Sequence, residues 1–162
     1  MGLKVGVDRI AHYASELGLG RPTGIYLPHE KPGIVPSSSW KKKRSGVPWY
    51  SGETLSLAVG QGYLNTTPLQ LVNLISAVSN NGIFYLPQVV ERVENIYGAV
   101  LKAYRPVEIG RANISENTFH IIQDALSGVV NEPRGTGWVC ALKGVKVAGC
   151  LLFAGENALH QW

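Results

Sequence analysis

Serine, lysine and asparagine at short spacings are the residues of this chain best suited to covalent chemistry. Ser38 and Lys41 stand three positions apart. One helical turn of separation lets a neutral lysine amine accept the proton of an attacking serine hydroxyl. Ser79-Asn80-Asn81 and Ser115-Glu116-Asn117 add two S-x-N spacings, which relay hydrogen bonds beside such a serine in known acyl-transfer sites. The chemistry that these residues suggest is therefore serine acylation.

The surroundings of Ser38 argue against that role. A proline-rich and serine-rich stretch precedes it, three further cations accompany Lys41, and no apolar residues at helical spacing would bury a helix start there. We therefore expect Ser38 to lie in a loop, and we predict that none of these matches is a catalytic box.

The basic run Lys41–Arg44 has a second interpretation. Trp40 and Trp49-Tyr50 flank it, so cations and aromatic rings together could hold phosphates and bases. Outside the run, eleven basic residues balance eleven acidic ones, and we therefore predict no nucleic-acid partner. A binding module that uses this loop on an anionic polymer or lipid surface remains the alternative function.

The residues that bind metals and nucleotides are sparse. Cys140 and Cys150 are the only cysteines, and the four histidines show no metal-ligand spacing. We predict no metal and no cofactor, and we expect both cysteines to be small buried residues. Gly60-Gln61-Gly62 lacks the third glycine of a nucleotide-binding loop, so these glycines indicate close backbone packing instead.

Length and composition indicate one domain or part of one. The chain has 162 residues, of which 45% are hydrophobic and 16% are charged, enough to bury a core. No stretch reaches the roughly 18 apolar residues of a membrane span, and Met1–Ile10 has no signal core. We therefore expect this chain to lack both a membrane anchor and a secretory signal.

Local patterns predict three helices. Apolar spacing favours a helix over Asp8–Leu17, which Gly18 ends. Thr67-Pro68-Leu69-Gln70 is typical of a helix start with a capping box, and Asn80-Asn81-Gly82 ends that helix. Ser115 is the expected cap of the third helix.

Strand patterns and one long irregular segment complete the prediction. Val89–Ile96 and Val100–Tyr104 form a predicted hairpin, and short strands are expected at Gly24–Leu27 and Val145–Gly149. Leu19–Trp49 contains five of the nine prolines, which predicts a long irregular loop. The mixture predicts an α+β domain.

Five ordered motifs resemble the class B penicillin-binding proteins of the elongation type, the penicillin-binding protein 2 group. The resemblance runs from about residue 2 to residue 149, and its GQG–TPLQ and WYxGET parts are specific. The matching segments are Gly18–Glu30, Pro48–Thr54, Ala58–Tyr63 with Thr67–Leu71, Asn80–Gly82 and Gly135–Gly137.

This resemblance implies a fold and an activity. It implies an antiparallel sheet flanked by helices, the penicillin-binding and β-lactamase-like transpeptidase fold, of which residues 1–162 would be a partial domain with an incomplete sheet. The family consists of membrane-anchored, periplasm-facing D,D-transpeptidases. Its members acylate a serine with D-Ala-D-Ala stem peptides of peptidoglycan, and β-lactams trap the same serine. Membrane proteins of the elongation complex would be partners.

The resemblance also locates what this chain is expected to lack. The nucleophile helix and the S-x-N loop belong before Gly18-Leu19-Gly20, so we expect neither here. Val145–Gly149 resembles the start of the edge strand that holds substrate, where the family continues with Lys-Thr-Gly. Cys150-Leu151-Leu152 stands there instead, which removes a charge-assisted grip on the substrate carboxylate. Gly149, Cys150, Leu151 and Leu152 are thus the predicted, altered substrate-binding positions.

Two further expectations follow from the resemblance. Gly60, Gln61, Gly62, Thr66 and Thr67 are the predicted structural residues near the floor of the active site. Residues 150–162 depart from the family pattern, and a shift of reading frame over positions 150–155 is our hypothesis for that departure. The chain alone is then expected to be inactive and to fold only marginally, because apolar surface would stay uncovered.

Overall fold

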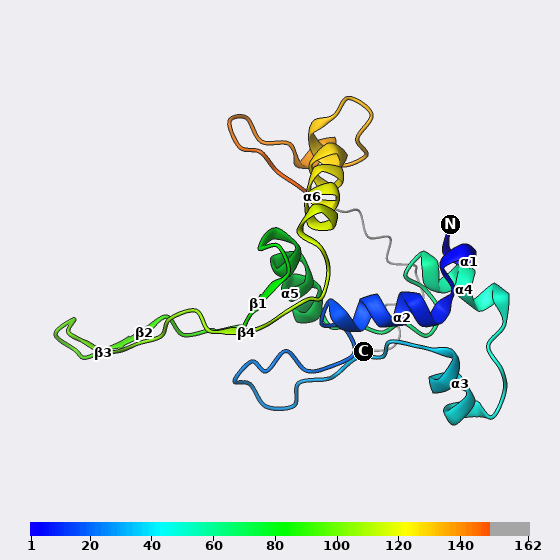
Figure 1. Cartoon of the computed structure of the whole chain (residues 1–162). Helices are drawn as coiled ribbons and strands as arrows, with labels where there is room; N and C mark the ends of the chain where they lie inside the picture. The colour runs from blue at the N-terminus through cyan, green and yellow to red at the C-terminus, as the bar shows by residue number, and fades with distance from the viewer. Residues whose placement is uncertain (150–162) are drawn as a thin grey trace. The chain divides into compact units, whose positions relative to one another are not determined.

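The computed structural model describes residues 1–149, and the chain divides into two compact units. The first unit is Met1–Asn113 and the second begins at Ile114. Figure 1 shows the elements of both along the chain.

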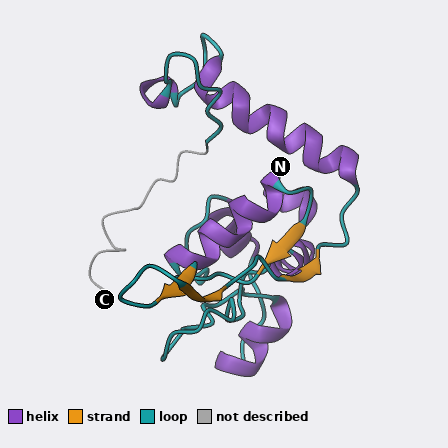
Figure 2. Cartoon of the chain, turned by 90° about the vertical axis from the view of Figure 1, so that its left-hand side faces the viewer, coloured by secondary structure: helices purple, strands orange, loops and turns teal. Residues whose placement is uncertain are grey.

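Five helices belong to the first unit, and Figure 2 shows how loops separate them. The helix expected over 8–17 is confirmed as α2, which ends before Gly18 with that glycine at φ 85°. The five helices are α1 (Gly2–Val5), α2 (Val7–Glu16), α3 (Ser38–Ser45), α4 (Ser51–Ala58) and α5 (Pro68–Ser79).

Helix α5 begins as its sequence predicts. The Thr67 side chain accepts a hydrogen bond from the Gln70 amide, and the Gln70 side chain accepts one from the Thr67 amide. This reciprocal pair satisfies two of the amides that a helix start leaves without partners. The helix ends at Asn80, and Asn81 and Gly82 follow with positive φ.

Helix α3 corrects the expected loop at Ser38. Ser37 caps the helix by accepting from the Trp40 amide, and Gly46 ends it with φ 72°. Asp8 stabilises the N-terminal end of α3, because its carboxylate accepts from both the amide and the hydroxyl of Ser38. The helix thus depends on capping and tertiary contacts rather than on apolar periodicity, which is why the pattern missed it.

Four short strands form two antiparallel pairs in the first unit. Strand β1 (Ile83–Tyr85) pairs with β4 (Glu108–Arg111), a pairing that the sequence did not indicate. Between them, β2 (Arg92–Glu94) and β3 (Val100–Ala103) form the predicted hairpin. Its turn is held by Asn95, whose side chain accepts from the amides of Tyr97 and Ala99.

Two predicted strands are absent from the described residues. Residues 24–27 form none, because Gly24 takes φ 83° and its amide donates to Glu30. Residues 145–149 form none either, because Gly149 donates to the Leu126 carbonyl and the Val147 carbonyl accepts from Asn131. In both segments, local partners take the backbone groups that a sheet would use.

The second unit is described up to Gly149. It contains α6 (Glu116–Asn131), capped by Ser115 as predicted, and the single turn η1 (Trp138–Cys140). Cys140 is exposed on that turn, so the expectation that it is buried is wrong. Cys150 lies outside the described residues.

The buried side chains of each unit are few. Those of the first unit gather from α2, α4, α5 and β1, and Phe119 and Val130 are buried in the second. Within residues 1–149, no helix is long and apolar enough to cross a membrane. The core positions of the first unit are Val7, Ala11, Leu19, Leu57, Ala77, Val78, Phe84 and Ala112.

Candidate functional site

Gln70 joins two motifs that are far apart in the sequence. Its side chain is 1% exposed, and its amide nitrogen donates to the carbonyls of Arg21 and Pro32 at 2.8 Å each. Its oxygen meanwhile caps α5 through the Thr67 amide at 2.9 Å. The first turn of α5 therefore fixes both ends of the segment between Arg21 and Pro32.

Glu30 stabilises a bend inside the Arg21–Pro32 segment. Its carboxylate accepts from the hydroxyl and amide of Thr23 and from the amide of Gly24, at 2.6, 2.7 and 3.1 Å. Partial burial raises the pKa of Glu30, but the hydrogen bonds from Thr23 and Gly24 outweigh it and bring the pKa below its usual value. The carboxylate thus acts as a clamp on the Thr23-Gly24 bend.

Gly33 lies where the segment meets the approach to α5. It has φ 67°, and a Cβ there would lie 2.4 Å from the Asn65 carbonyl and 2.9 Å from the Gln70 side-chain oxygen. The neighbouring residue Ile34 exchanges two backbone hydrogen bonds with Asn65. Only glycine fits this crossing of the two backbones.

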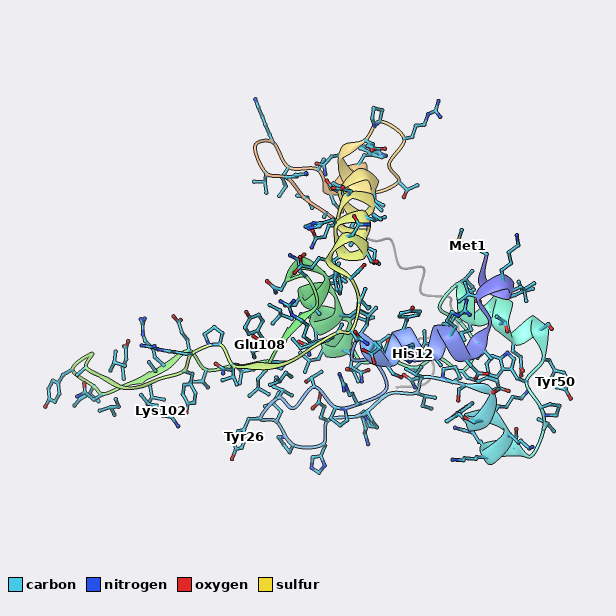
Figure 3. All side chains as sticks on the ribbon, in the orientation of Figure 1. Met1, His12, Tyr26, Tyr50, Lys102 and Glu108 are labelled. Atoms are coloured by element: carbon cyan, nitrogen blue, oxygen red, sulfur yellow. The ribbon has the colours of Figure 1, made fainter. Side chains whose placement is uncertain are left out.

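Lys41 is a buried cation rather than a solvated one. It is 4% exposed and its amine forms an ion pair with Glu53. The amine also lies 4.4 Å from the ring centre of Tyr50, which Figure 3 shows on the segment between α3 and α4. The Lys41 hydrogen bond, together with one from the Tyr50 amide, lowers the pKa of Glu53. The pair ties α3 to the start of α4.

Tyr63, which follows Gly60-Gln61-Gly62 in the chain, packs against two tryptophans, Trp40 of α3 and Trp49 before α4. Its ring centre lies 5.4 Å from that of Trp40 and 6.2 Å from that of Trp49. The Trp49 indole in turn donates to Thr54 of α4. Arg44 lies over Trp40 with 5.2 Å between the guanidinium and the ring centre. Two of the four cations of the basic run are therefore engaged in this aromatic cluster (Trp40, Trp49, Tyr50 and Tyr63).

The predicted floor residues lie in the segment that joins α4 to α5, on either side of Tyr63. Gly60 and Gly62 both take positive φ, at 78° and 79°, and Gln61 donates to the Ser56 carbonyl. All three are exposed, whereas Thr66 and Thr67 are half-buried. These five residues are neighbours along the chain, and their place near an active-site floor stays a prediction. Gly149 belongs to the second unit, and residues 150–152 lie outside the described residues.

The serine and lysine of the S-x-x-K match have separate partners. The hydroxyl of Ser38 donates to Asp8 at 2.8 Å, whereas the Lys41 amine pairs with Glu53. No hydrogen bond joins Ser38 to Lys41 in the described part of the chain. The geometry thus assigns Lys41 a structural ion pair with Glu53, so Lys41 is not placed to act as the general base of Ser38.

Sequence reasoning missed three residues that organise this region. The sequence indicates Gln70 as a cap but not as a tertiary hydrogen-bond donor, and it indicates no partner for Glu30 or Lys41. The residues around Gln70 do not indicate that its side-chain amide donates to carbonyls as distant in the sequence as those of Arg21 and Pro32. For Lys41, no sequence signal selects Glu53, because Glu30 and Glu53 are almost equally far from it along the chain. Among residues 1–149, no cluster of three or more His, Cys, Asp or Glu side chains could hold a metal.

The fold and these motifs define a class of protein. The family model described as penicillin binding protein transpeptidase domain matches residues 1–149, and the chain belongs to that family. The predicted resemblance to the penicillin-binding protein 2 group is likewise confirmed by its relatives.

The relatives cover most of this chain. It is 36% identical over 136 residues to peptidoglycan D,D-transpeptidase MrdA of Salmonella typhimurium strain LT2, a match that covers 83% of this chain and 22% of that protein. Identity to MrdA of Escherichia coli K12 is 33% over 132 residues, or 82% of this chain and 21% of that one. The chain spans about a fifth of the length of these relatives.

Solved structures agree with the predicted fold class. Penicillin-binding protein 2 of Helicobacter pylori superposes with a TM-score of 0.74 at 26% identity, covering 91% of this chain and 26% of that one. A second structure of that protein is a complex with MreC. Penicillin-binding protein 2 of Pseudomonas aeruginosa superposes with a TM-score of 0.67 at 28% identity, over 86% and 32%. The α+β fragment of a transpeptidase fold is therefore confirmed.

Proposed function

We propose that this chain forms the middle part of a peptidoglycan D,D-transpeptidase domain and supports its active site without supplying the nucleophile. The observation that carries the proposal is the convergence on Gln70. This residue of the Thr67–Gln70 motif donates to the backbone of the Gly18–Glu30 motif and of Pro32. Segments that identify the family thereby form one hydrogen-bonded unit.

In the intact transpeptidase, the reaction is a two-step acyl transfer. A serine oxygen forms an ester with the penultimate D-Ala carbonyl of one stem peptide, and the terminal D-Ala leaves with the serine's proton on its amine. The amine of a second stem then attacks the ester and restores the serine hydroxyl. Gly60–Gly62, Thr66 and Thr67 would shape the floor of that site, and Gly149 with residues 150–152 would lie along the substrate backbone.

The proposed setting follows from the relatives. A membrane-anchored enzyme facing the periplasm fits the penicillin-binding protein 2 group, and the Helicobacter pylori complex with MreC supports a protein partner from the elongation system. The alternative of a binding module at Lys41–Arg44 is weakened, because Lys41 and Arg44 already engage Glu53 and Trp40.

A chimera tests the proposal. The matched stretch of Escherichia coli MrdA is replaced by residues 1–149 of this chain, and covalent labelling by a fluorescent penicillin is measured on a gel. We expect labelling that unlabelled β-lactam blocks, since the host supplies the serine and its base. A chimera that also carries Ser38→Ala should label equally. A monodisperse chimera that takes up no label would contradict the proposal.

A further inference from the structure

The first unit contains a pocket of about 350 Å³ that residues 60–67 do not line. It lies between the segment after α2, the middle of α5 and the β1–β4 pair. Phe84, which is buried, forms part of its lining, and a Cβ on Gly18 would meet the Phe84 ring at 3.2 Å. A volume of this size is at the lower end of small-molecule sites.

The polar lining of this pocket is cationic. Arg21, Arg111 and Asn73 are among its lining residues, and no Asp or Glu among the described residues lines it. The carboxylate of Glu30, which accepts hydrogen bonds from the lining residue Thr23, keeps its negative charge, but the two arginines still leave this region with a positive balance. Planar guanidinium groups match the paired oxygens of carboxylates and phosphates. The charge of the pocket therefore favours an oxyanion.

Two of these donors have capacity for a ligand. In the described part of the chain, neither the Arg21 guanidinium nor the Asn73 side chain has a hydrogen-bond or ion-pair partner, although Asn73 is half-buried. Ile109 and Phe84 add apolar surface beside them. We propose that the pocket binds a small organic oxyanion, whose carboxylate or phosphate group is held by the Arg21 guanidinium and the Asn73 side chain, with Arg111 adding positive charge nearby. This site is independent of the proposed transpeptidase function.

The test is an NMR titration of the isotope-labelled full chain at about 15 °C, near which small domains are typically most stable. Glutarate is the carboxylate probe, inorganic phosphate is the phosphate probe, and potassium chloride at matched ionic strength is the blank. We expect saturable shifts of the Thr23 and Gly110 amides and of the Asn73 side chain. Saturation by only one probe identifies which oxyanion chemistry the pocket takes.

Matched arginine variants separate binding from general charge. Arg21→Gln should weaken binding about tenfold or more, because a charged hydrogen bond is lost. Arg105→Gln, on an exposed residue outside the pocket, should leave the affinity unchanged. Arg21→Lys keeps the charge but loses the fork geometry, so it should weaken binding even if the glutamine variant unfolds. Shifts that only follow ionic strength, or equal weakening by Arg105→Gln, would overturn the proposal.

Discussion

At the scale of single residues, Gln70 makes the most consequential contacts, because three backbone groups depend on its side chain. Replacing it with leucine keeps the apolar volume but leaves the Thr67 amide and the carbonyls of Arg21 and Pro32 without partners. We expect Gln70→Leu to lower the free energy of unfolding by about 2–4 kcal/mol. Urea titration followed by tryptophan fluorescence measures this change.

The control for this variant is Gln88→Leu. Gln88 is exposed and donates a single hydrogen bond, to the Arg105 carbonyl. Water can replace that bond, so we expect a change within about 0.5 kcal/mol. Equal effects of the two substitutions would mean that Gln70 does not organise the Arg21–Pro32 segment.

Glu53 gives the Lys41 ion pair a defined pH dependence. The pKa of Glu53 is lowered in the folded chain from an ordinary value of 4.5, first by the Lys41 hydrogen bond and then by the Tyr50 amide. A carboxyl with a lowered folded pKa stabilises the fold fully above the unfolded pKa and loses that contribution as pH falls through the folded pKa.

Glu53→Gln should therefore destabilise the chain at about pH 7 and have a smaller effect at about pH 3. Urea midpoints at the two pH values measure the difference, with Glu94→Gln as an exposed ion-paired control. An effect of Glu53→Gln that is independent of pH would show that the ion pair contributes nothing.

At the scale of elements, the crossing of two backbones at Gly33 depends on the missing side chain. Gly33 and Gly46 both take positive φ, at 67° and 72°, but only Gly33 has atoms within reach of an added Cβ. Alanine at Gly46 should cost about 1 kcal/mol from its backbone conformation alone. Alanine at Gly33 should cost at least about 2 kcal/mol more, because the Asn65 carbonyl must move.

Thermal melts of these two variants measure the difference, since they share the backbone cost. Equal melting temperatures would show that the approach of Gly33 to Asn65 is not tight in solution.

The elements that the sequence predicted are those whose signals are local. The Thr67 capping box, the Ser115 cap and the hairpin around Tyr97-Gly98 all depend on residues within a few positions of one another. Helix α3 and the β1–β4 pairing were missed because Asp8 and residues 108–111 act on them from far away in the chain. The strands expected at 24–27 and 145–149 failed because Glu30 and α6 take their backbone groups.

In the candidate site too, features with local sequence signals were predictable, and features that depend on distant contacts were not. The motifs at Gly60–Gly62 and Thr67–Gln70 are recognisable from the sequence as a family signature. The close backbone packing expected at the two glycines is wrong: both take positive φ, but an added Cβ would meet nothing within 4 Å at Gly60 and only the Ser56 side chain, at 3.5 Å, at Gly62. The burial of Lys41 was not recognisable, because a run of four cations indicates a solvated face unless a carboxylate such as Glu53 is known to lie opposite it.

At the scale of the whole molecule, the chain alone should not be acylated by penicillin. Ser38 hydrogen-bonds Asp8, and the Lys41 amine pairs with Glu53 instead of serving as its base. Intact-mass spectrometry after incubation with penicillin should show the unmodified mass, and Ser38→Ala should behave identically. A stoichiometric adduct on any serine would contradict this prediction.

The chain alone should also unfold over a broad temperature range. It divides into two units with few buried side chains in each, and large apolar residues such as Ile96, Tyr97 and Trp138 are exposed. Calorimetry should therefore give a van't Hoff enthalpy that differs from the calorimetric one. A single sharp and reversible transition of the monomer would contradict this.

The long sequence separation between Gln70 and its acceptors has a consequence for folding during synthesis. Its acceptors on Arg21 and Pro32 leave the ribosome 49 and 38 residues earlier than Gln70 itself. At translation rates of about 5–20 residues per second, these carbonyls wait roughly 2–10 s for their donor. During that interval Glu30 and the backbone hydrogen bonds of Gly18 and Leu19 to the end of α2 can shape the Gly18–Pro32 segment, but the carbonyls of Arg21 and Pro32 obtain their donor only after α5 has begun to be synthesised.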